Sequence, residues 1–304
     1  MRVVKPVVIT DAMLTSNIPE PDASVGEVLW TAGTYNTGDR RILTSTHIIY
    51  QVVADPSTTD APDVGAAKTV PTWVAVGPTN RWAMFDQVND TKSTAPSPIE
   101  IEIETGQLTN SLAVFNLNGS SDVTVTMTDP VAGVVYTNNI DMIDNSDVVD
   151  YYEYFFSPII NKNEFVLLDL PAYKNATISV SIAGDAAISL GTLIVGAQIT
   201  LGVALYGTSM QLLDFSRKER NEFGNYVIVP RRTSKLVDFD VIIDKDKIGY
   251  VFNKLASLTT IPAVWVGTDV NDDSTLVYGY YKDSQINIDG PVKCTATIQI
   301  EGLT

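Results

Sequence analysis

Few residues of the sequence could carry out catalysis. His47 is the sole histidine and Cys294 the sole cysteine. A histidine-based triad would have to use His47, but no serine in a nucleophile-elbow motif lies near it. The two residues together exclude an intrachain disulfide and the usual zinc site, and the sequence has no phosphate-binding Gly-x-x-x-x-Gly-Lys loop. We therefore expect a non-enzymatic protein without cofactors, in which His47 is structural and Cys294 is buried in a strand.

Two groups of polar residues could offer oxygen ligands to a calcium ion. They are Asp141, Asp144, Asp147 and Asp150, at every third position, and Asp269, Asn271, Asp272 and Asp273. Neither group fits the EF-hand loop, and exposed acidic loops are usually only solvated, so we predict no metal site. A glycosidase would need two carboxylates facing each other across a cleft. Sequence spacing cannot place such a pair, so that alternative stays open.

Four aromatic residues in the N-terminal third suggest a surface that binds sugars. Trp30, Tyr35, Tyr50 and Trp73 accompany a Gly-Asp turn at 38–39, and flat aromatic rings can cover the apolar face of a pyranose. Their order resembles the small chitin-binding modules attached to chitinases, although two arginines at 40–41 and an acidic insertion at 60–68 depart from that pattern. The alternative is that the rings form the core of a small domain, which has few other residues to bury.

The charge balance limits the expected partners. The formal net charge is −16 and the isoelectric point is about 4.3. Nucleic acid is therefore not an expected partner, because phosphate binding needs a basic patch. The concentrated basic stretches are Arg217–Arg220 and the set Arg231, Arg232 and Lys235. We interpret them as a solvated loop, with a local role at an acidic subunit surface as the alternative.

The most apolar stretch of the chain is residues 186–206. It contains Gly191, Gly196 and Gly202 and is rich in β-branched residues. It therefore predicts two buried strands joined by a turn rather than a membrane helix. The first residues have a short apolar run interrupted by Pro6, which does not match a signal peptide. We expect no membrane insertion, and synthesis in a reducing cytoplasm, where disulfides are not needed.

Strand-forming and turn-forming residues dominate the composition and divide the chain into four regions. We predict a mainly β, multi-domain protein. Its parts are an extended arm (1–24), a small aromatic-rich β module (25–98) ending in a proline-bounded linker (93–98), a jelly-roll or β-sandwich domain (99–210), and a C-terminal β-rich domain (211–304). The arm could pack on a neighbouring subunit or lie loose on the surface.

Apolar periodicity places the elements. Residues 99–104 alternate strictly between isoleucine and glutamate, which predicts one buried face and one exposed face. The other predicted strands are 26–30, 41–43, 47–53, 73–76, 112–117, 123–128, 134–140, 149–156, 165–170, 177–182, 189–195, 199–204, 229–232, 236–243, 263–267, 275–281 and 292–301. One helix, at about 245–258, carries Ile248, Val251, Phe252 and Leu255 on one face.

Residues 76–86, Val-Gly-Pro-Thr-Asn-Arg-Trp-Ala-Met-Phe-Asp, resemble a segment found in virion structural proteins of tailed bacteriophages. The order around the segment is similar too, with an aromatic-rich opening at 28–35, Tyr50 and Trp73 before it and a jelly-roll domain after it. Residues 231–239, 248–258, 262–267 and 294–303 resemble the last domain of such tail proteins. The resemblance implies a virion protein of the tail or baseplate, made in the host cytoplasm.

The same segment supplies candidate interface residues. Asn80 and Arg81 follow a turn, and we expect Arg81 to pair with Asp86 or Asp39 and lock the module. An exposed Arg81 is the alternative. Trp82, Met84 and Phe85 would then anchor the module to the jelly roll.

These points predict a structural subunit of the tail, such as a hub, ring, collar or fibre-attachment protein. Its partners would be copies of itself and neighbouring tail proteins. The alternative is a carbohydrate-binding adsorption protein that recognises a host surface glycan through Trp30, Tyr35, Tyr50 and Trp73. A depolymerase of the β-helix type is not expected, because the sequence has no internal repeat.

Overall fold

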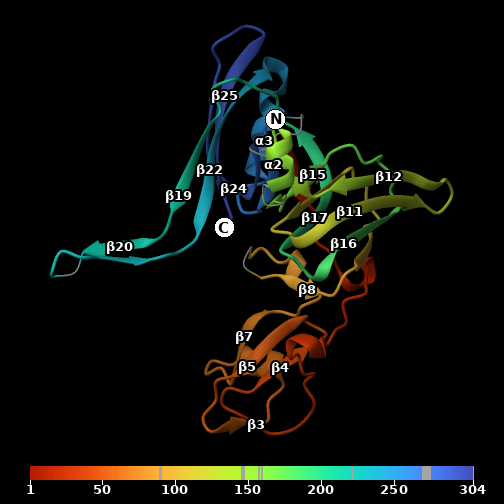
Figure 1. Cartoon of the computed structure of the whole chain (residues 1–304), viewed down its shortest axis with the longest axis vertical. Helices are drawn as coiled ribbons and strands as arrows, with labels where there is room; N and C mark the ends of the chain where they lie inside the picture. The colour runs from red at the N-terminus through yellow and green to blue at the C-terminus, as the bar shows by residue number, and fades with distance from the viewer. Residues whose placement is uncertain are drawn as a thin grey trace.

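A computed structural model describes residues 1–88, 91–144, 148–156, 158, 160–220, 222–268 and 275–303. The protein is mainly β, with 52% strand and 11% helix, as the sequence predicts. Figure 1 shows a small module at the bottom, a larger body of stacked sheets above it, and a long two-stranded arm that leaves the body sideways. Among the described residues, no helix is both long enough and apolar enough to cross a membrane.

The small module contains two short antiparallel sheets. Its elements are β3 (Tyr35–Asn36), β4 (Arg40–Leu43), β5 (Ile48–Val52), β6 (Ser57–Thr58), α1 (Pro62–Ala66) and β7 (Trp73–Pro78). Strands β4, β5 and β7 form one sheet, and β3 pairs with β6. The strand predicted at 26–30 is absent from the described structure, because that segment makes only a single bridge, between Leu29 and Ile42.

The first sheet of the body has six strands. They are β2 (Leu14–Ser16), β8 (Ser93–Ala95), β9 (Ile99–Glu104), β11 (Asn118–Asp129), β12 (Gly133–Asp141) and β16 (Thr177–Leu190). In β9 the isoleucines are buried and the glutamates exposed, as the alternation predicts. The linker predicted at 93–98 contributes a strand instead, since β8 pairs with β16 and buries Ser93 completely.

The second sheet of the body has ten strands and curls into a half-barrel. Its strands are β1 (Arg2–Pro6), β10 (Ser111–Phe115), β15 (Phe165–Leu167), β17 (Thr192–Thr200), β18 (Val203–Ala204), β19 (Ser209–Asp214), β22 (Thr233–Asp244), β23 (Ala263–Val266), β24 (Leu276–Asn287) and β25 (Lys293–Gly302). One face packs on the six-stranded sheet, where Val114 and Val195 share a core cluster with Ile101 and Val125. Because the sheet is curled, side chains of separate strands on its opposite face form a core cluster of their own. There the rings of Phe115 in β10 and Tyr278 in β24 stack 5.6 Å apart.

Strand β1 lies in the middle of this sheet. It pairs with β17 on one edge and with β23 on the other, and Val3 and Val4 are completely buried. The N-terminal segment 1–24, which the sequence predicts as an extended arm, therefore packs on its own chain over its first residues. Successive valines point to opposite faces of a strand, so each enters a different core cluster. Because β1 pairs with both β17 and β23, strands from the predicted regions 99–210 and 211–304 share one continuous sheet.

The predicted helix at 245–258 is confirmed as η4 (Lys245–Lys247) followed by α3 (Ile248–Ala256). Val251 and Leu255 lie in one core cluster with Trp265 and Phe239 of the ten-stranded sheet. Phe252, on the predicted apolar face, is 62% exposed instead. Cys294 is buried in β25, as expected from the alternation of that strand.

The strand predicted at 149–156 is wrong, because residues Tyr151–Phe156 form the helix α2. Local capping explains the difference. The Asp150 carboxylate accepts the amide of Glu153 at 2.9 Å, and the Glu153 carboxylate accepts the amide of Val149 at 2.7 Å. Such reciprocal bonds satisfy the unpaired amides of a helix N-terminus and outweigh the strand preference of the aromatic residues.

The apolar stretch 186–206 forms buried strands as predicted, but its two main strands belong to different sheets. Strand β16 ends at Leu190 in the six-stranded sheet, and β17 starts at Thr192 in the ten-stranded sheet. Gly191 makes the corner between them. A Cβ atom there would lie 2.6 Å from the Cβ of Asn116, so only glycine fits without a shift.

The remaining elements are short or belong to the projecting two-stranded arm. The short ones are η1 (Asp11–Met13), η2 (Ala23–Val25), η3 (Ala83–Phe85) and the pair β13 (Ile143–Asp144) and β14 (Ile160–Asn161). The arm is built from β19, β20 (Arg217–Arg220), β21 (Tyr226–Val229) and β22. Of the two acidic groups noted in the sequence, Asp147 and all of 269–273 lie outside the described residues.

We predict that Val3→Ala lowers the free energy of unfolding by about 2 kcal/mol, because the methyl groups of this side chain are lost from a closed core. Val8→Ala is the matched control, since Val8 is 83% exposed, and we expect its effect to stay within about 0.5 kcal/mol. Chemical denaturation of the two variants measures the difference. Equal stability of the variants would contradict the central position of β1.

Candidate assembly site

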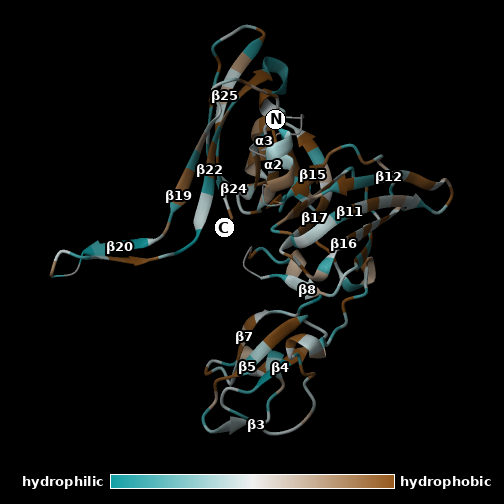
Figure 2. Ribbon diagram, viewed as in Figure 1, coloured by the Kyte–Doolittle hydropathy of each residue, from teal (hydrophilic) through white to brown (hydrophobic). Residues whose placement is uncertain are grey.

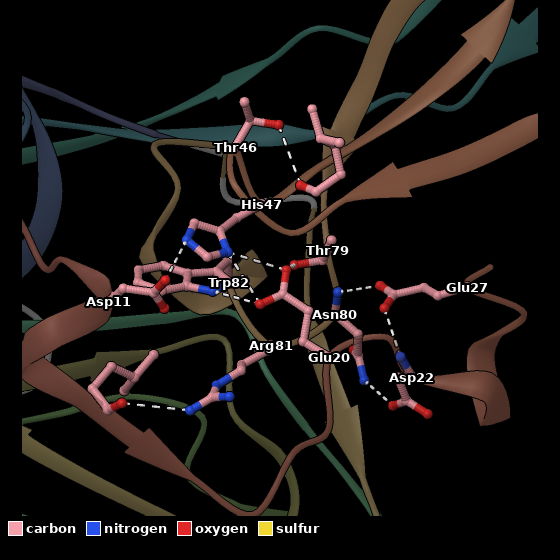
Figure 3. Close-up of polar contacts among 12 residues, drawn as sticks. Asp11, Glu20, Asp22, Glu27, Thr46, His47, Thr79, Asn80, Arg81 and Trp82 are labelled. Carbon is pink, nitrogen blue, oxygen red and sulfur yellow. Dashed lines mark hydrogen bonds and ion pairs between the residues drawn. The ribbon is translucent and has the colours of Figure 1, made fainter. Parts of the chain in front are cut away.

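A turn after β7 joins the small module to the body, and a buried carboxylate organises it (Figure 3). The Glu20 carboxylate accepts the Thr79 hydroxyl at 2.7 Å and the Trp82 indole Nε1 at 3.1 Å. It also contacts His47 Nδ1 at 3.1 Å. The imidazole of His47 stacks on the Trp82 ring at 4.2 Å. These contacts of the sole histidine hold the turn at 46–47 against the 79–82 turn.

A second set of bonds surrounds Asn80. Its side-chain amide donates to Asp22 Oδ2 at 2.7 Å and to the Thr94 carbonyl at 2.8 Å, and its Oδ1 accepts the Thr94 amide at 2.8 Å. The Glu27 carboxylate accepts the backbone amides of Asn80 at 2.6 Å and Asp22 at 2.8 Å. Asn80 thereby links the segment at 22–27 to strand β8 of the body.

Three carboxylates, those of Glu20, Asp22 and Glu27, are buried at this junction. Their partners are mainly neutral donors rather than lysines or arginines. Burial of Asp22 favours its neutral form, but hydrogen bonds from Ser24 and Asn80 outweigh burial and hold the pKa of this carboxyl below its usual value. Its stabilising contribution is therefore complete above about pH 4 and is lost as the pH falls through the lowered pKa.

Trp82, Met84 and Phe85 connect the turn to the core of the body. Met84 is completely buried, and its amide donates to the Ser93 hydroxyl at 3.0 Å. Trp82 lies in the same core cluster as the isoleucines of β9, and Phe85 packs against that cluster. The module is thus fixed to the body by apolar packing as well as by the buried bonds.

Arg81 does not form the ion pair expected from the sequence. Among the described residues its guanidinium donates to the Leu14 carbonyl at 3.4 Å, and its buried Nε atom has no hydrogen-bond partner. Asp39 instead accepts the Asn36 amide, and Asp86 accepts the Val88 amide and the Thr91 hydroxyl. Burial raises the pKa of Asp86.

The four aromatic residues proposed as a sugar platform are mostly inside the module. Trp73 is fully buried, Tyr35 and Tyr50 are also buried, and Trp30 is partly buried against them. Tyr35 meets Trp73 edge-on at 5.5 Å, and the Trp73 indole donates to the Asp60 carbonyl at 3.0 Å. This packing favours the core alternative, because a sugar needs an open ring face and these rings are covered.

The projecting arm is the second surface of interest. Its tip strands β20 and β21 are exposed at all of their residues, including the run Tyr226-Val-Ile-Val229. In Figure 2 this run is brown along one side of the tip. None of these apolar side chains belongs to a core cluster among the residues that the structure describes. The base of the arm, in contrast, is anchored by Leu236, Val237 and Phe239.

The sequence did not predict either surface in full. The sequence predicts a solvated loop at the basic stretches, whereas Arg217–Arg220 forms an exposed strand of the arm. The three carboxylates carry no sequence signal, because their donors lie up to 62 positions away along the chain. For the arm a signal is present: a run of charged residues at 217–220, a turn with Gly224, and a four-residue apolar run are typical of a hairpin.

We predict that Asn80→Asp destabilises the protein by about 3 kcal/mol at neutral pH, because it replaces two donated bonds by a carboxylate beside Asp22. The loss should shrink at acidic pH, where one of the two carboxyls takes up a proton. Asn175→Asp, at an exposed position, is the control for the added charge. Urea titrations at two pH values measure both effects, and a loss independent of pH would contradict this arrangement.

Trp73→Ala should lower the free energy of unfolding by about 4 kcal/mol, because it leaves a large cavity in a small core. Trp73→Phe keeps most of the ring and should cost less. Thermal unfolding followed by tryptophan fluorescence checks the order of the variants. A folded, fully stable Trp73→Ala protein that loses binding on a glycan array would instead support the sugar platform.

The sequence was also compared with known proteins. No protein family matches the chain, and no characterised protein matches it. The function is therefore inferred from the fold, the module junction and the arm.

Proposed function

We propose that the protein is a structural subunit of a tailed bacteriophage particle, at the tail or baseplate, and that it acts by assembly without catalysing a reaction. Its partners would be copies of itself and neighbouring tail proteins. The observation that carries the proposal is the arm, whose tip presents apolar side chains that its own chain leaves uncovered. Exposed apolar strands of this kind usually mark surfaces that bind another protein.

The energetics of the arm support an assembly role. An isolated two-stranded hairpin is only marginally stable in water, because it lacks a layer against which to bury its side chains. The pair β20–β21 has no such layer within the described chain. A neighbouring subunit that covers the tip would supply it and would convert exposed apolar area into buried area.

The body fits the same proposal. Two antiparallel sheets pack face to face around one core, and we assign this pair to a β-sandwich of the jelly-roll type, as the resemblance to phage tail proteins implies. The buried junction at Asn80 and Glu20 would fix the small module relative to this body. A rigid particle needs subunits whose parts keep one orientation. The adsorption alternative has less support, because its aromatic rings lie in a core.

The test is the composition of purified particles. We expect mass spectrometry to find the wild-type chain in intact particles in a constant ratio to other tail proteins. A variant in which an Asn-Gly turn joins Ser216 directly to Arg231 lacks the tip but keeps the base of the arm. We expect it to fold normally and to be missing from particles, because the tip supplies the contact.

The thermal stability of this shortened variant is the control, and it should equal that of the wild type because the tip contributes nothing to a core. A wild-type chain absent from particles would refute the proposal. Normal incorporation of the shortened variant would show that another surface makes the contact.

A further inference from the structure

Helix α2 is the most exposed aromatic feature among the described residues. Five of its six residues are Tyr151, Tyr152, Tyr154, Phe155 and Phe156, and each is at least 70% exposed. Their ring contacts are with one another, at 4.8 Å for Tyr152–Phe156 and 5.2 Å for Tyr154–Phe155. In the described part of the chain none of them joins a core cluster. Aromatic area of this size on a soluble surface marks a binding site.

The sequence around α2 is acidic. Between Lys92 and Lys162 the sequence has no lysine, arginine or histidine, but it has ten aspartates and glutamates. Asp150 and Glu153 lie at the start of the helix. We call this surface, α2 with these two carboxylates, the acidic aromatic patch. A partner that matches it must offer both apolar and cationic side chains.

The tip of the arm has that chemistry on one of its two faces. Strand pairing sets Lys218 opposite Ile228 and Arg220 opposite Tyr226, so these four side chains share a face. Arg220 already lies over the Tyr226 ring, 4.7 Å from its centre. The other face carries Arg217 and Glu219, which pair with each other at 2.7 Å, together with Val227 and Val229. Lys218 also pairs with Asp214, at 2.6 Å. The first face therefore combines apolar side chains with two cations, of which Lys218 is already paired, and it keeps a net positive charge, whereas the second is close to neutral.

We infer that the cationic face of the arm tip in one copy of the chain binds the acidic aromatic patch of a second copy. Exposed aliphatic and tyrosine side chains of the tip would cover the aromatic rings, while Lys218 and Arg220 meet the carboxylates and the ring faces. Figure 1 shows the tip pointing away from the body that carries α2, so one copy cannot make this contact with itself. The inference rests on the proposed assembly function and names its partner.

Such a contact uses the tip of one copy and the patch of the other, so the first copy keeps a free patch and the second a free tip for further neighbours. Repetition of a head-to-tail contact gives a closed ring or an open chain. A second copy explains the pairing of surfaces better than a lipid bilayer does, because carboxylates beside the aromatic rings would be repelled by anionic headgroups.

The test uses a cysteine on each surface. One preparation carries Ile228→Cys, on the cationic face, and the other carries Phe155→Cys. Cys294 is buried and stays unreactive. After mixing and mild oxidation, we expect a disulfide-linked dimer of the two preparations. Val229→Cys, on the opposite face of the tip, is the matched control and should crosslink at least tenfold less. Equal yields from the two tip positions, or no crosslink from Ile228→Cys, would overturn the inference.

A second measurement tests the charges. We expect Lys218→Glu/Arg220→Glu to weaken self-association by about tenfold or more, whereas Arg217→Glu should have a much smaller effect. Sedimentation measures the association constants, and a wild-type chain that stays monomeric at high concentration would overturn the inference. If the crosslink fails while mass spectrometry still finds the chain in particles, only this inference falls. If the crosslink forms but particles lack the chain, the proposed function falls and the self-contact stands.

Discussion

The pairing of β1 with β17 on one edge and with β23 on the other makes a single sheet out of two sets of strands. One set, β10, β15 and β17, packs on the six-stranded sheet; the other, β22–β25, packs on α3. Without the N-terminal strand these sets would meet at two free edges in the middle of a curled sheet. The first residues of the chain therefore hold together segments that are formed much later in synthesis, and the body depends on them for its continuity.

A different constraint fixes the small module. Burying a carboxylate is unfavourable unless several donors satisfy it, and the junction buries three of them. Each donor is in place only when the 20–27 segment, the turn at His47, the turn at Asn80 and strand β8 are all in one arrangement. Apolar packing by Trp82 and Met84 alone would tolerate some sliding. The hydrogen bonds therefore select one orientation, and the packing supplies most of the stabilisation.

The sequence predicted what depends on local periodicity and little of what depends on long-range pairing. The alternation at 99–104 and the helix at 245–258 were correct because each pattern has one stable way to bury its apolar face. The strand at 149–156 was wrong because a capping interaction overrode the preference of aromatic residues. The linker at 93–98 became β8, and the N-terminal arm became β1, because neighbours nearly a hundred to two hundred positions away complete their pairing. At the site, Asn80, Trp82 and Phe85 lie at the junction as expected, but the carboxylates that accept from Asn80 and Trp82 could not be inferred.

The distribution of charge connects the arm to the rest of the molecule. Basic residues cluster at 217–235 in a chain whose net charge is −16, so the remainder of the surface attracts the arm electrostatically. Attraction alone would fold the arm back onto its own body, but the pairing of β19 with β22 extends it outward. The tip thus stays away from its own acidic surface while it remains complementary to that of another copy. A hairpin without a core is also the part of a chain that opens most easily. Binding to a neighbour would then order and protect the segment that the isolated subunit stabilises least.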